Sequence, residues 1–314
     1  MDKKRVDIAK SEADSRIKSA ISRIPLLKNT TKIIPIDGGL TNMNLRIDTE
    51  ENSYFMRLSE PGSEFLCIDR KNEKINTERA HIAGVGPELI AWLEEEKILL
   101  VRWLDAKTLH IEDFHSHPSI FDKITFAIRK LHLGPNFEGR FDFPALRKNY
   151  LSRALSSNYF IPEGYCEMES KIIALEKIIA SNPELLVPCN NDLLAENFMD
   201  DGLKIWIIDY EYSGQNEASF EIGNLTSEIS FSQTEIEMFC ESYWGEKIPA
   251  KVYRAMAWSL IARYGWVMWA SIQEFISPIQ FDFRTWGLKK WHSVLEDMTN
   301  GHYENLLKNL KETN

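Results

Sequence analysis

The sequence has few cysteines, and none of them are paired by spacing. Four cysteines are spread over 314 residues without a CxxC motif, which excludes a disulfide framework or a cysteine-rich zinc site. We interpret Cys67, Cys166, Cys189 and Cys240 as reduced, packing thiols of a cytosolic protein. The sequence also lacks a run of about eighteen apolar residues and an apolar signal-peptide core near its start. It therefore predicts a cytoplasmic protein without a membrane span.

Positive charge is scarce as well. Lys and Arg number 37 against 47 Asp and Glu, for a net charge of −10. Binding to a nucleic acid backbone needs a positive surface, so nucleic acid is excluded as a partner. An acidic surface suits a small cationic substrate or a metal–nucleotide complex, and it could equally serve solubility. Neither GxxxxGK[ST] nor GxGxxG occurs, which excludes a Walker loop and a dinucleotide-binding fold.

Short alternating or β-branched runs dominate the first third of the chain. They predict five antiparallel strands with one inserted helix, after an N-terminal helix that ends near Leu27. The strands are expected within residues 31–40, 41–48, 52–59, 88–93 and 97–104, and the inserted helix within residues 63–84.

Helical periodicity dominates the remainder of the chain. Apolar stripes predict helices within residues 119–134, 167–183, 252–275 and 281–298. We therefore expect two domains. Residues 1–103 would form a β-rich lobe, and residues 104–314 would form an α-rich lobe.

One constellation of polar residues suggests phosphoryl transfer. Asp192 precedes Asn197 by five residues, and Asp209 follows the next apolar strand. Phosphoryl transfer needs a base beside the accepting hydroxyl and oxygen ligands for a metal ion. Two turn residues and a strand-end cap would give the same pattern, so both interpretations stay open on spacing alone.

Two features of the first lobe fit a nucleotide site. The stretch "DGGLTNMN" from Asp37 to Asn44 could lay main-chain N–H groups over phosphates, or could be a plain hairpin turn. Arg57 is a charge inside an apolar strand, which exposure at a sheet edge could explain. Glu73 on the following helix offers it an ion-pair partner.

Several stretches together resemble one enzyme family. They are "GGLTNMNLRI", "YFMRL", "NNDLLAENF", "IIDYEYSGQNEASFEIGN" and "RYGWVMWASIQ". From about Ile36 to Trp291 the chain resembles the choline/ethanolamine kinases, protein-kinase-like phosphotransferases related to the aminoglycoside phosphotransferases. The resemblance implies a bilobal α+β fold, with a small antiparallel sheet lobe that carries one helix and a larger, mainly helical lobe.

The resemblance also implies roles for individual residues in catalysis. Asp192 would be the catalytic base, and Asn197 and Asp209 would bind Mg²⁺. Glu211 would support the metal site or its water. ATP would be the phosphate donor. The nucleotide-binding residues would be Gly38, Gly39, Thr41 and Asn42 in a phosphate-covering loop, Arg57 paired with Glu73, and the main chain near Leu104 beside adenine.

On the acceptor side, the resemblance places an acidic residue and aromatic rings around a cationic head group. Glu228 would be the acid, and Trp266, Trp269 and Trp286 would form the cage walls. A quaternary ammonium donates no hydrogen bonds, so ring faces and a carboxylate are what can recognise it. Without the resemblance, core packing would be the better interpretation of these tryptophans.

One position departs from the family pattern. Family members usually carry His two residues before the base, and this chain has Asn190. Asn can both donate and accept hydrogen bonds, so it could hold the same main-chain framework. We therefore predict an active choline kinase. The alternatives are a kinase of ethanolamine or another amino alcohol, an aminoglycoside phosphotransferase, and a catalytically silent protein that binds nucleotide or choline. No oligomeric state is predicted.

Overall fold

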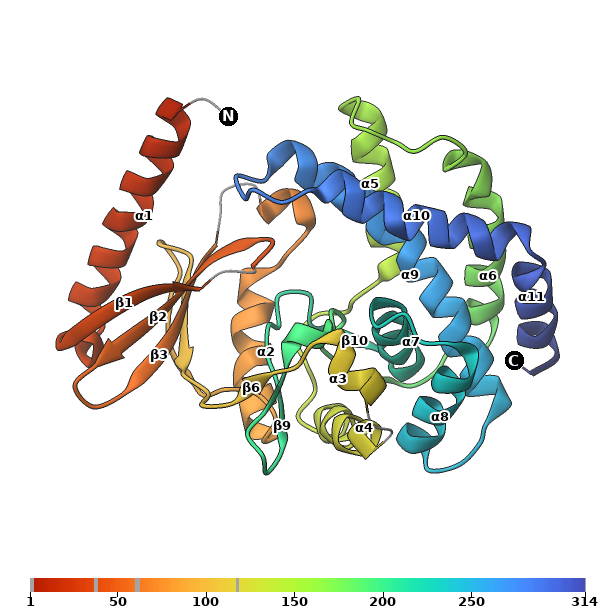
Figure 1. Cartoon of the computed structure of the whole chain (residues 1–314), viewed down its shortest axis with the longest axis horizontal. Coiled ribbons are helices and arrows are strands. Elements are labelled where there is room, and N and C mark those ends of the chain that lie inside the picture. Colours follow the sequence, from red (N-terminus) through yellow and green to blue (C-terminus); the bar gives the residue numbers. More distant parts are fainter. Residues whose placement is uncertain (1–2, 37–38, 60–62, 117–118, 314) are drawn as a thin grey trace. The chain divides into compact units, whose positions relative to one another are not determined.

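A computed structural model describes residues 3–36, 39–59, 63–116 and 119–313 (Figure 1). The chain divides into two compact units. We call them the sheet unit, which comprises Met1–Ser63 and Pro87–Asp105, and the helical unit, which comprises Glu64–Gly86 and Ala106–Asn314. Within the described ranges, no helix has the length and apolar character needed to cross a bilayer.

The sheet unit contains a five-stranded antiparallel sheet, in the order β1-β2-β3-β5-β4. This confirms the five predicted strands. The central place of β3 contradicts the suggestion that Arg57 lies at a sheet edge, and Arg57 is buried. The strands are β1 (Thr30–Ile36), β2 (Asn42–Thr49), β3 (Ser53–Ser59), β4 (Leu89–Leu93) and β5 (Ile98–Arg102).

Helix α1 (Lys3–Arg23) packs on this sheet, as the red helix beside the sheet in Figure 1 shows. Its buried side chains recur at helical spacing, so one stripe of the helix faces the strands. They join a core cluster with Leu45, Ile47 and Met56 of the sheet. The stripe consists of Ala13, Ile17 and Ala20, and Ile24, directly after the helix, continues it. The predicted N-terminal helix is therefore confirmed.

The helical unit combines short strands with most of the helices. Its strands form a two-stranded sheet, β10-β7, and a three-stranded sheet, β6-β8-β9. The strands are β6 (Lys107–Thr108), β7 (Leu186–Cys189), β8 (Phe198–Asp200), β9 (Ile205–Ile207) and β10 (Gly214–Glu217). The helices are α2 (Arg70–Ile82), α3 (Ile111–Ser116), α4 (Ser119–His132), α5 (Phe143–Ser156), α6 (Glu169–Ser181), α7 (Ala218–Glu228), α8 (Gln233–Trp244), α9 (Pro249–Ile276), α10 (Phe283–Thr299) and α11 (His302–Thr313).

Helix α2 groups with the helical unit, whereas we predicted it within a lobe of residues 1–103. The difference has a physical reason in its long-range contacts. Asn76 Nδ2 donates to the main-chain oxygens of Glu138 at 3.1 Å and Ser213 at 3.2 Å. Ala80 joins the apolar core of the helical unit. The other predicted boundary, after residue 103, lies close to the one after Asp105.

Helix α9 is the central packing element of the helical unit. It contacts α5, α6, α7, α8, α10 and α11, and its buried residues run along most of its length. Helices α7 and α9 approach each other closely at Gly223. A Cβ atom there would lie 2.3 Å from the carbonyl oxygen of Ala255 and 2.8 Å from Cβ of Trp258. This pair of helices therefore has no room for a side chain at residue 223.

We expect Gly223→Ala to lower the free energy of unfolding by about 1–3 kcal/mol, because the added methyl group overlaps main-chain atoms of α9. Urea unfolding followed by circular dichroism measures the change. In an open helix, alanine is more stable than glycine by about 1 kcal/mol. The sign of the change in unfolding free energy therefore distinguishes close packing from helix propensity, and a stabilised variant would contradict the close packing.

Candidate active site

A hairpin connects Asn197 to Asp209. Strands β8 and β9 pair antiparallel, with Phe198 opposite Ile207. Beyond that pair, the Ile208 N–H donates to the carbonyl oxygen of Asn197 at 3.0 Å. Asn197 and Asp209 therefore lie at the same end of the hairpin, as the sequence predicts.

Asp192 is tied to that same end. The Nδ2 of Asn197 donates to the carbonyl oxygen of Asp192 at 2.7 Å. This bond uses the amide nitrogen of Asn197, and the amide oxygen is the atom type that binds hard cations. Asp209 has φ +59°, in the left-handed region that is uncommon for residues other than glycine. Such backbone strain is concentrated at functional sites.

The carboxylates of this region repel one another. Burial raises the pKa of Asp192 well above its usual value, and the charges of Asp209 and Glu211 raise it further. Glu228 acts in the same direction, whereas the ammonium of Lys290 lowers the pKa. A divalent cation would relieve this repulsion, and the oxygen donors are of the kind that Mg²⁺ prefers. The residues present therefore fit a magnesium site.

Asn190 holds the main chain on both sides of this cluster. Its Nδ2 donates to the carbonyl oxygens of Asp209 at 2.7 Å and Ile208 at 3.2 Å. Its Oδ1 accepts from the Asp192 N–H at 3.1 Å. The expectation that an asparagine can hold this framework is confirmed. With Asn190 in the place of the usual histidine, the loop that carries Asp192 is therefore hydrogen-bonded to the main chain at Asp209.

We expect Asn190→Ala to lower kcat by roughly tenfold to a hundredfold, because a misplacement of about 1 Å at the reacting groups can have an effect of that size. The KM for ATP should change little. Steady-state kinetics with varied ATP and acceptor measures both. Asn190→His, which restores the usual family residue, should retain most of the activity. An alanine variant with the parent kcat would show that the bonds of Asn190 do not position the site.

Arg70 joins two acidic residues, Glu73 and Glu211, whose predicted roles are separate. Its Nη1 lies 2.8 Å from Oε2 of Glu73 and 3.1 Å from Oε2 of Glu211. All three side chains are largely buried. Arg70 was not predicted from the sequence, although its spacing of three residues from Glu73 on one helix was a usable signal. This bridge fixes the side chain of Glu211 beside the strand end that carries Asp209.

The predicted nucleotide-binding residues outside the loop fall in both units. Arg57 lies in β3 of the sheet unit, and Glu73 is buried in α2 of the helical unit. Their predicted ion pair stays a prediction. Leu104 is half-buried and lies two residues after the end of β5.

The predicted phosphate-covering loop lies between β1 and β2. Gly38 lies outside the described residues. At Gly39 a Cβ atom would lie 2.7 Å from Nδ2 of Asn44 and 3.0 Å from the carbonyl oxygen of Asn42, so a larger residue would push on Asn44. The Nδ2 of Asn42 donates to Oγ1 of Thr41 at 2.8 Å. The described part of the loop therefore has little room for a side chain at residue 39, and its role in covering phosphates stays a prediction.

The three predicted cage tryptophans form one aromatic cluster. The ring of Trp269 lies 6.4 Å from that of Trp266 and 5.4 Å from that of Trp286, between centroids. The indole N–H of Trp266 donates to Oδ1 of Asn224 at 2.8 Å, and that of Trp269 to the hydroxyl of Tyr212 at 3.0 Å. Trp266 and Trp269 are buried, and Trp286 is half-buried. Trp286 is therefore the ring with the most accessible surface.

A cation already lies against this cluster. The Nζ of Lys290 lies 2.6 Å and 2.7 Å from the two carboxylate oxygens of Glu228. The same Nζ lies 4.3 Å from the ring centroid of Trp286. Glu228 and Trp286 were predicted as site residues, but Lys290 was not. Lys290 follows Trp286 by four residues and so shares its helix face.

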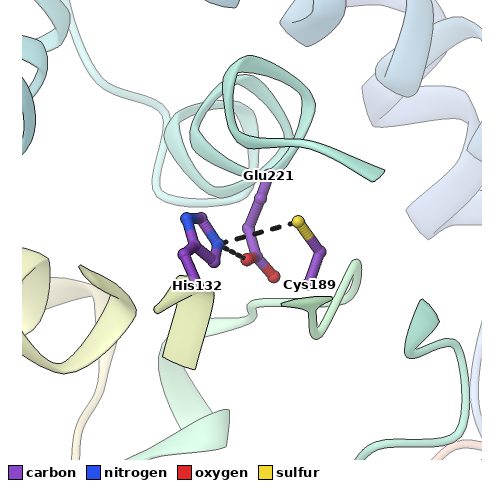
Figure 2. A group of neighbouring side chains, drawn as sticks. All are labelled: His132, Cys189 and Glu221. Atoms are coloured by element: carbon purple, nitrogen blue, oxygen red, sulfur yellow. Dashed lines mark hydrogen bonds and ion pairs between the residues drawn. The ribbon is translucent and has the colours of Figure 1, made fainter. Parts of the chain in front are cut away.

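Figure 2 shows a second buried group of three side chains. It contains His132 from the end of α4, Cys189 from β7 and Glu221 from α7, with candidate ligand atoms within 4.8 Å of one another. His132 is hydrogen-bonded through Nε2 to Glu221 and through Nδ1 to the hydroxyl of Tyr243, the latter at 2.5 Å. Both ring nitrogens are thus used, and burial raises the pKa of the Cys189 thiol. We interpret the group as structural support for the loop that contains Asn190, Asn191 and Asp192, because Glu221 also accepts a hydrogen bond from the Asn191 N–H at 2.8 Å.

Comparison with known proteins identifies one family. The sequence model of the family described as "Choline/ethanolamine kinase" matches residues 33–294. The matched range includes the loop between β1 and β2, the loop that carries Asp192, the hairpin of β8 and β9, the tryptophan cluster and Lys290.

Individual relatives agree with this match. Ethanolamine kinase 2 of Rattus norvegicus is 26% identical over 291 residues, which cover 82% of this chain and 74% of that protein. The crystal structure of a choline/ethanolamine kinase family protein from Mesorhizobium loti has a TM-score of 0.82 at 27% identity, over 96% of this chain and 99% of that one. Choline kinase LicA from Streptococcus pneumoniae shares the fold, with a TM-score of 0.75 at 24% identity over 89% and 96% of the two chains. The predicted α+β kinase-like fold is therefore confirmed.

Proposed function

The chain belongs to the choline/ethanolamine kinase family, and from that premise we propose that it transfers the γ-phosphate of ATP to the hydroxyl group of choline. The family makes the chain a phosphotransferase with an alcohol acceptor. The observation that carries the proposal is the convergence of Asp192, Asn197 and Asp209 at the end of one hairpin, held by Asn190.

In this proposal Asp192 is the base. Its carboxylate takes the proton of the acceptor hydroxyl as the acceptor oxygen forms a bond to the γ-phosphorus. The bond from the γ-phosphorus to the β,γ-bridging oxygen breaks, and ADP leaves with that oxygen. Burial and neighbouring carboxylates raise the pKa of Asp192 in the protein without metal. A bound Mg²⁺ would lower this pKa again, and so would keep Asp192 in the ionised form that a base needs.

The metal site in this proposal is formed by Asn197 and Asp209. A bound Mg²⁺ would neutralise the negative charge of the ATP phosphates. Glu211 would support the metal site or its water, and its ion pair with Arg70 at 3.1 Å fixes its side chain for that purpose.

The nucleotide contacts are carried over from the family resemblance. Main-chain N–H groups of the loop after β1 would cover the phosphates, and Arg57 would contact them. The main chain near Leu104 would hydrogen-bond adenine. The loop residues are Gly38, Gly39, Thr41 and Asn42.

The acceptor's cationic head would lie between Glu228 and the ring of Trp286, with Trp266 and Trp269 behind that ring. The position of Lys290 supports this assignment, because a lysine ammonium is itself a cation on an aromatic face and a carboxylate. The same observation favours ethanolamine as the second candidate acceptor. A primary ammonium can remake the two hydrogen bonds that Lys290 gives to Glu228, whereas the quaternary ammonium of choline cannot.

A coupled assay of ADP release with choline, ethanolamine and a panel of aminoglycosides tests the proposal. We expect turnover with choline, slower turnover with ethanolamine and none with aminoglycosides. A preference for ethanolamine would transfer the proposal to the second candidate. Tight nucleotide binding without ADP release for any acceptor would favour the silent binding protein instead.

A further inference from the structure

The ion pair of Lys290 and Glu228 is nearly enclosed. The two side chains are 11% and 10% exposed, and both carboxylate oxygens of Glu228 are within 2.7 Å of Nζ. The ammonium also lies on the face of Trp286. A side chain of the protein therefore occupies the position that suits a cationic ligand, with the same two kinds of contact.

This pair belongs to the surroundings of the base. The indole N–H of Trp269 donates to the hydroxyl of Tyr212, which is next to Glu211 in the chain, at 3.0 Å. The ring of Trp286 is in contact with that of Trp269, at 5.4 Å between centroids. The pair is thus part of the acceptor side of the site that the proposed function describes.

A cationic acceptor that enters the site meets the carboxylate of Glu228, whose charge Lys290 already neutralises. While Lys290 stays on Glu228, a second positive charge would gain little from the acid and would be repelled by the lysine. The flexible four-carbon stem of lysine allows its ammonium to leave. Binding of a cationic acceptor therefore requires a state in which Lys290 has moved away from Glu228.

We propose that Lys290 is an internal competitor for the cationic head of the acceptor, and that it sets the affinity of the site for amino alcohols. The inference rests on the proposed function. The apparent Kd equals the intrinsic Kd divided by the fraction of molecules in which Glu228 is open. Because this fraction is a property of the free protein, Lys290 must weaken the binding of every cationic acceptor by the same factor.

The test is isothermal titration calorimetry of the full chain with choline, ethanolamine and tetramethylammonium, in the absence of ATP. If the open state is populated at roughly 10% or less, Lys290→Met should lower the Kd for all three cations by about tenfold or more, and by a common factor. Lys290→Gln, which keeps a hydrogen-bond donor without the charge, should show a smaller decrease. The matched control is Lys289→Met, which removes the adjacent exposed ammonium and should leave each Kd unchanged.

A fold check accompanies the titration, because Lys290→Met leaves Glu228 with an unpaired charge. The thermal midpoint of the variant should rise more on addition of choline than that of the parent protein. An unchanged or raised Kd in both Lys290 variants would overturn the proposal, as would an equal decrease in the Lys289 control. Absence of cation binding in every variant would overturn it together with the proposed acceptor site. Cation binding with the expected pattern but no ADP release would support the role of Lys290 and reject only the kinase function.

Discussion

Replacement of Asp192 by asparagine is expected to lower kcat by a factor of about 10²–10⁴, the usual contribution of a positioned general base. The amide of asparagine has no lone pair basic enough to take the hydroxyl proton. The main-chain bonds of residue 192 to Asn190 and Asn197 do not involve the carboxylate, so the loop should keep its shape. Steady-state kinetics gives kcat, and equilibrium titration with ATP should give a nearly unchanged Kd.

A carboxylate in the same loop provides the control. Glu196 is exposed and lies between Asp192 and Asn197, so Glu196→Gln should leave kcat close to that of the parent chain. The Asp192→Asn variant should also unfold at a temperature no lower than the parent does without Mg²⁺, because the amide removes repulsion from Asp209 and Glu211. Parent-like turnover in Asp192→Asn would remove this residue from the mechanism. A large fall in the unfolding temperature would instead assign the loss to structure.

The second large effect is expected on stability, at a buried ion pair. Arg254→Met should lower the free energy of unfolding by about 3–5 kcal/mol, because it leaves the buried carboxylate of Glu217 without its cation. Arg254 donates to Glu217 through Nε at 3.0 Å and through Nη2 at 2.8 Å. Its Nη2 also donates to the carbonyl oxygen of Ile179 at 3.1 Å, which links α9 to α6. Urea unfolding measures the change.

Two further variants separate the loss of the pair from the loss of a large side chain. Arg254→Met combined with Glu217→Gln should recover much of the stability, because the orphaned charge is gone. The exposed pair of Arg284 and Glu274 is the matched control, with side chains 49% and 33% exposed. Arg284→Met should change the stability by about 1 kcal/mol or less. Similar effects of the two methionine variants would contradict the role of burial.

The parts of the fold that depend on neighbouring residues could be predicted from the sequence. The strands of the sheet unit and the hairpin of β8 and β9 follow from alternation and turn residues. The start of α2 at Arg70 had a local signal too, because Asp69 caps it by accepting from the N–H groups of Lys71 and Asn72. The grouping of α2 with the helical unit could not be predicted. It depends on contacts such as that of Asn76 with Ser213, 137 residues away.

In the candidate site too, residues close in sequence could be predicted together, whereas contacts between distant residues could not. Asp192, Asn197 and Asp209 lie in one short stretch, and a single hairpin brings them together. The charge pairs that complete the site span 62 residues for Lys290 and Glu228, and 141 residues for Arg70 and Glu211. A single sequence does not show which of many charged residues meet. The family resemblance located the acidic partners, but it gave no indication that a lysine would occupy the cation position.

The packing of α1 on the sheet has a practical consequence for anyone who shortens this chain. The family match begins only at residue 33, so a trimmed version designed from that match would omit the helix. The sheet would then present Leu45, Ile47 and Met56 to water, on the face that Ile17 and Ile24 now shield. Exposed apolar strands favour self-association. The first residue of the family match is therefore not a suitable first residue for a shortened protein that should stay monodisperse.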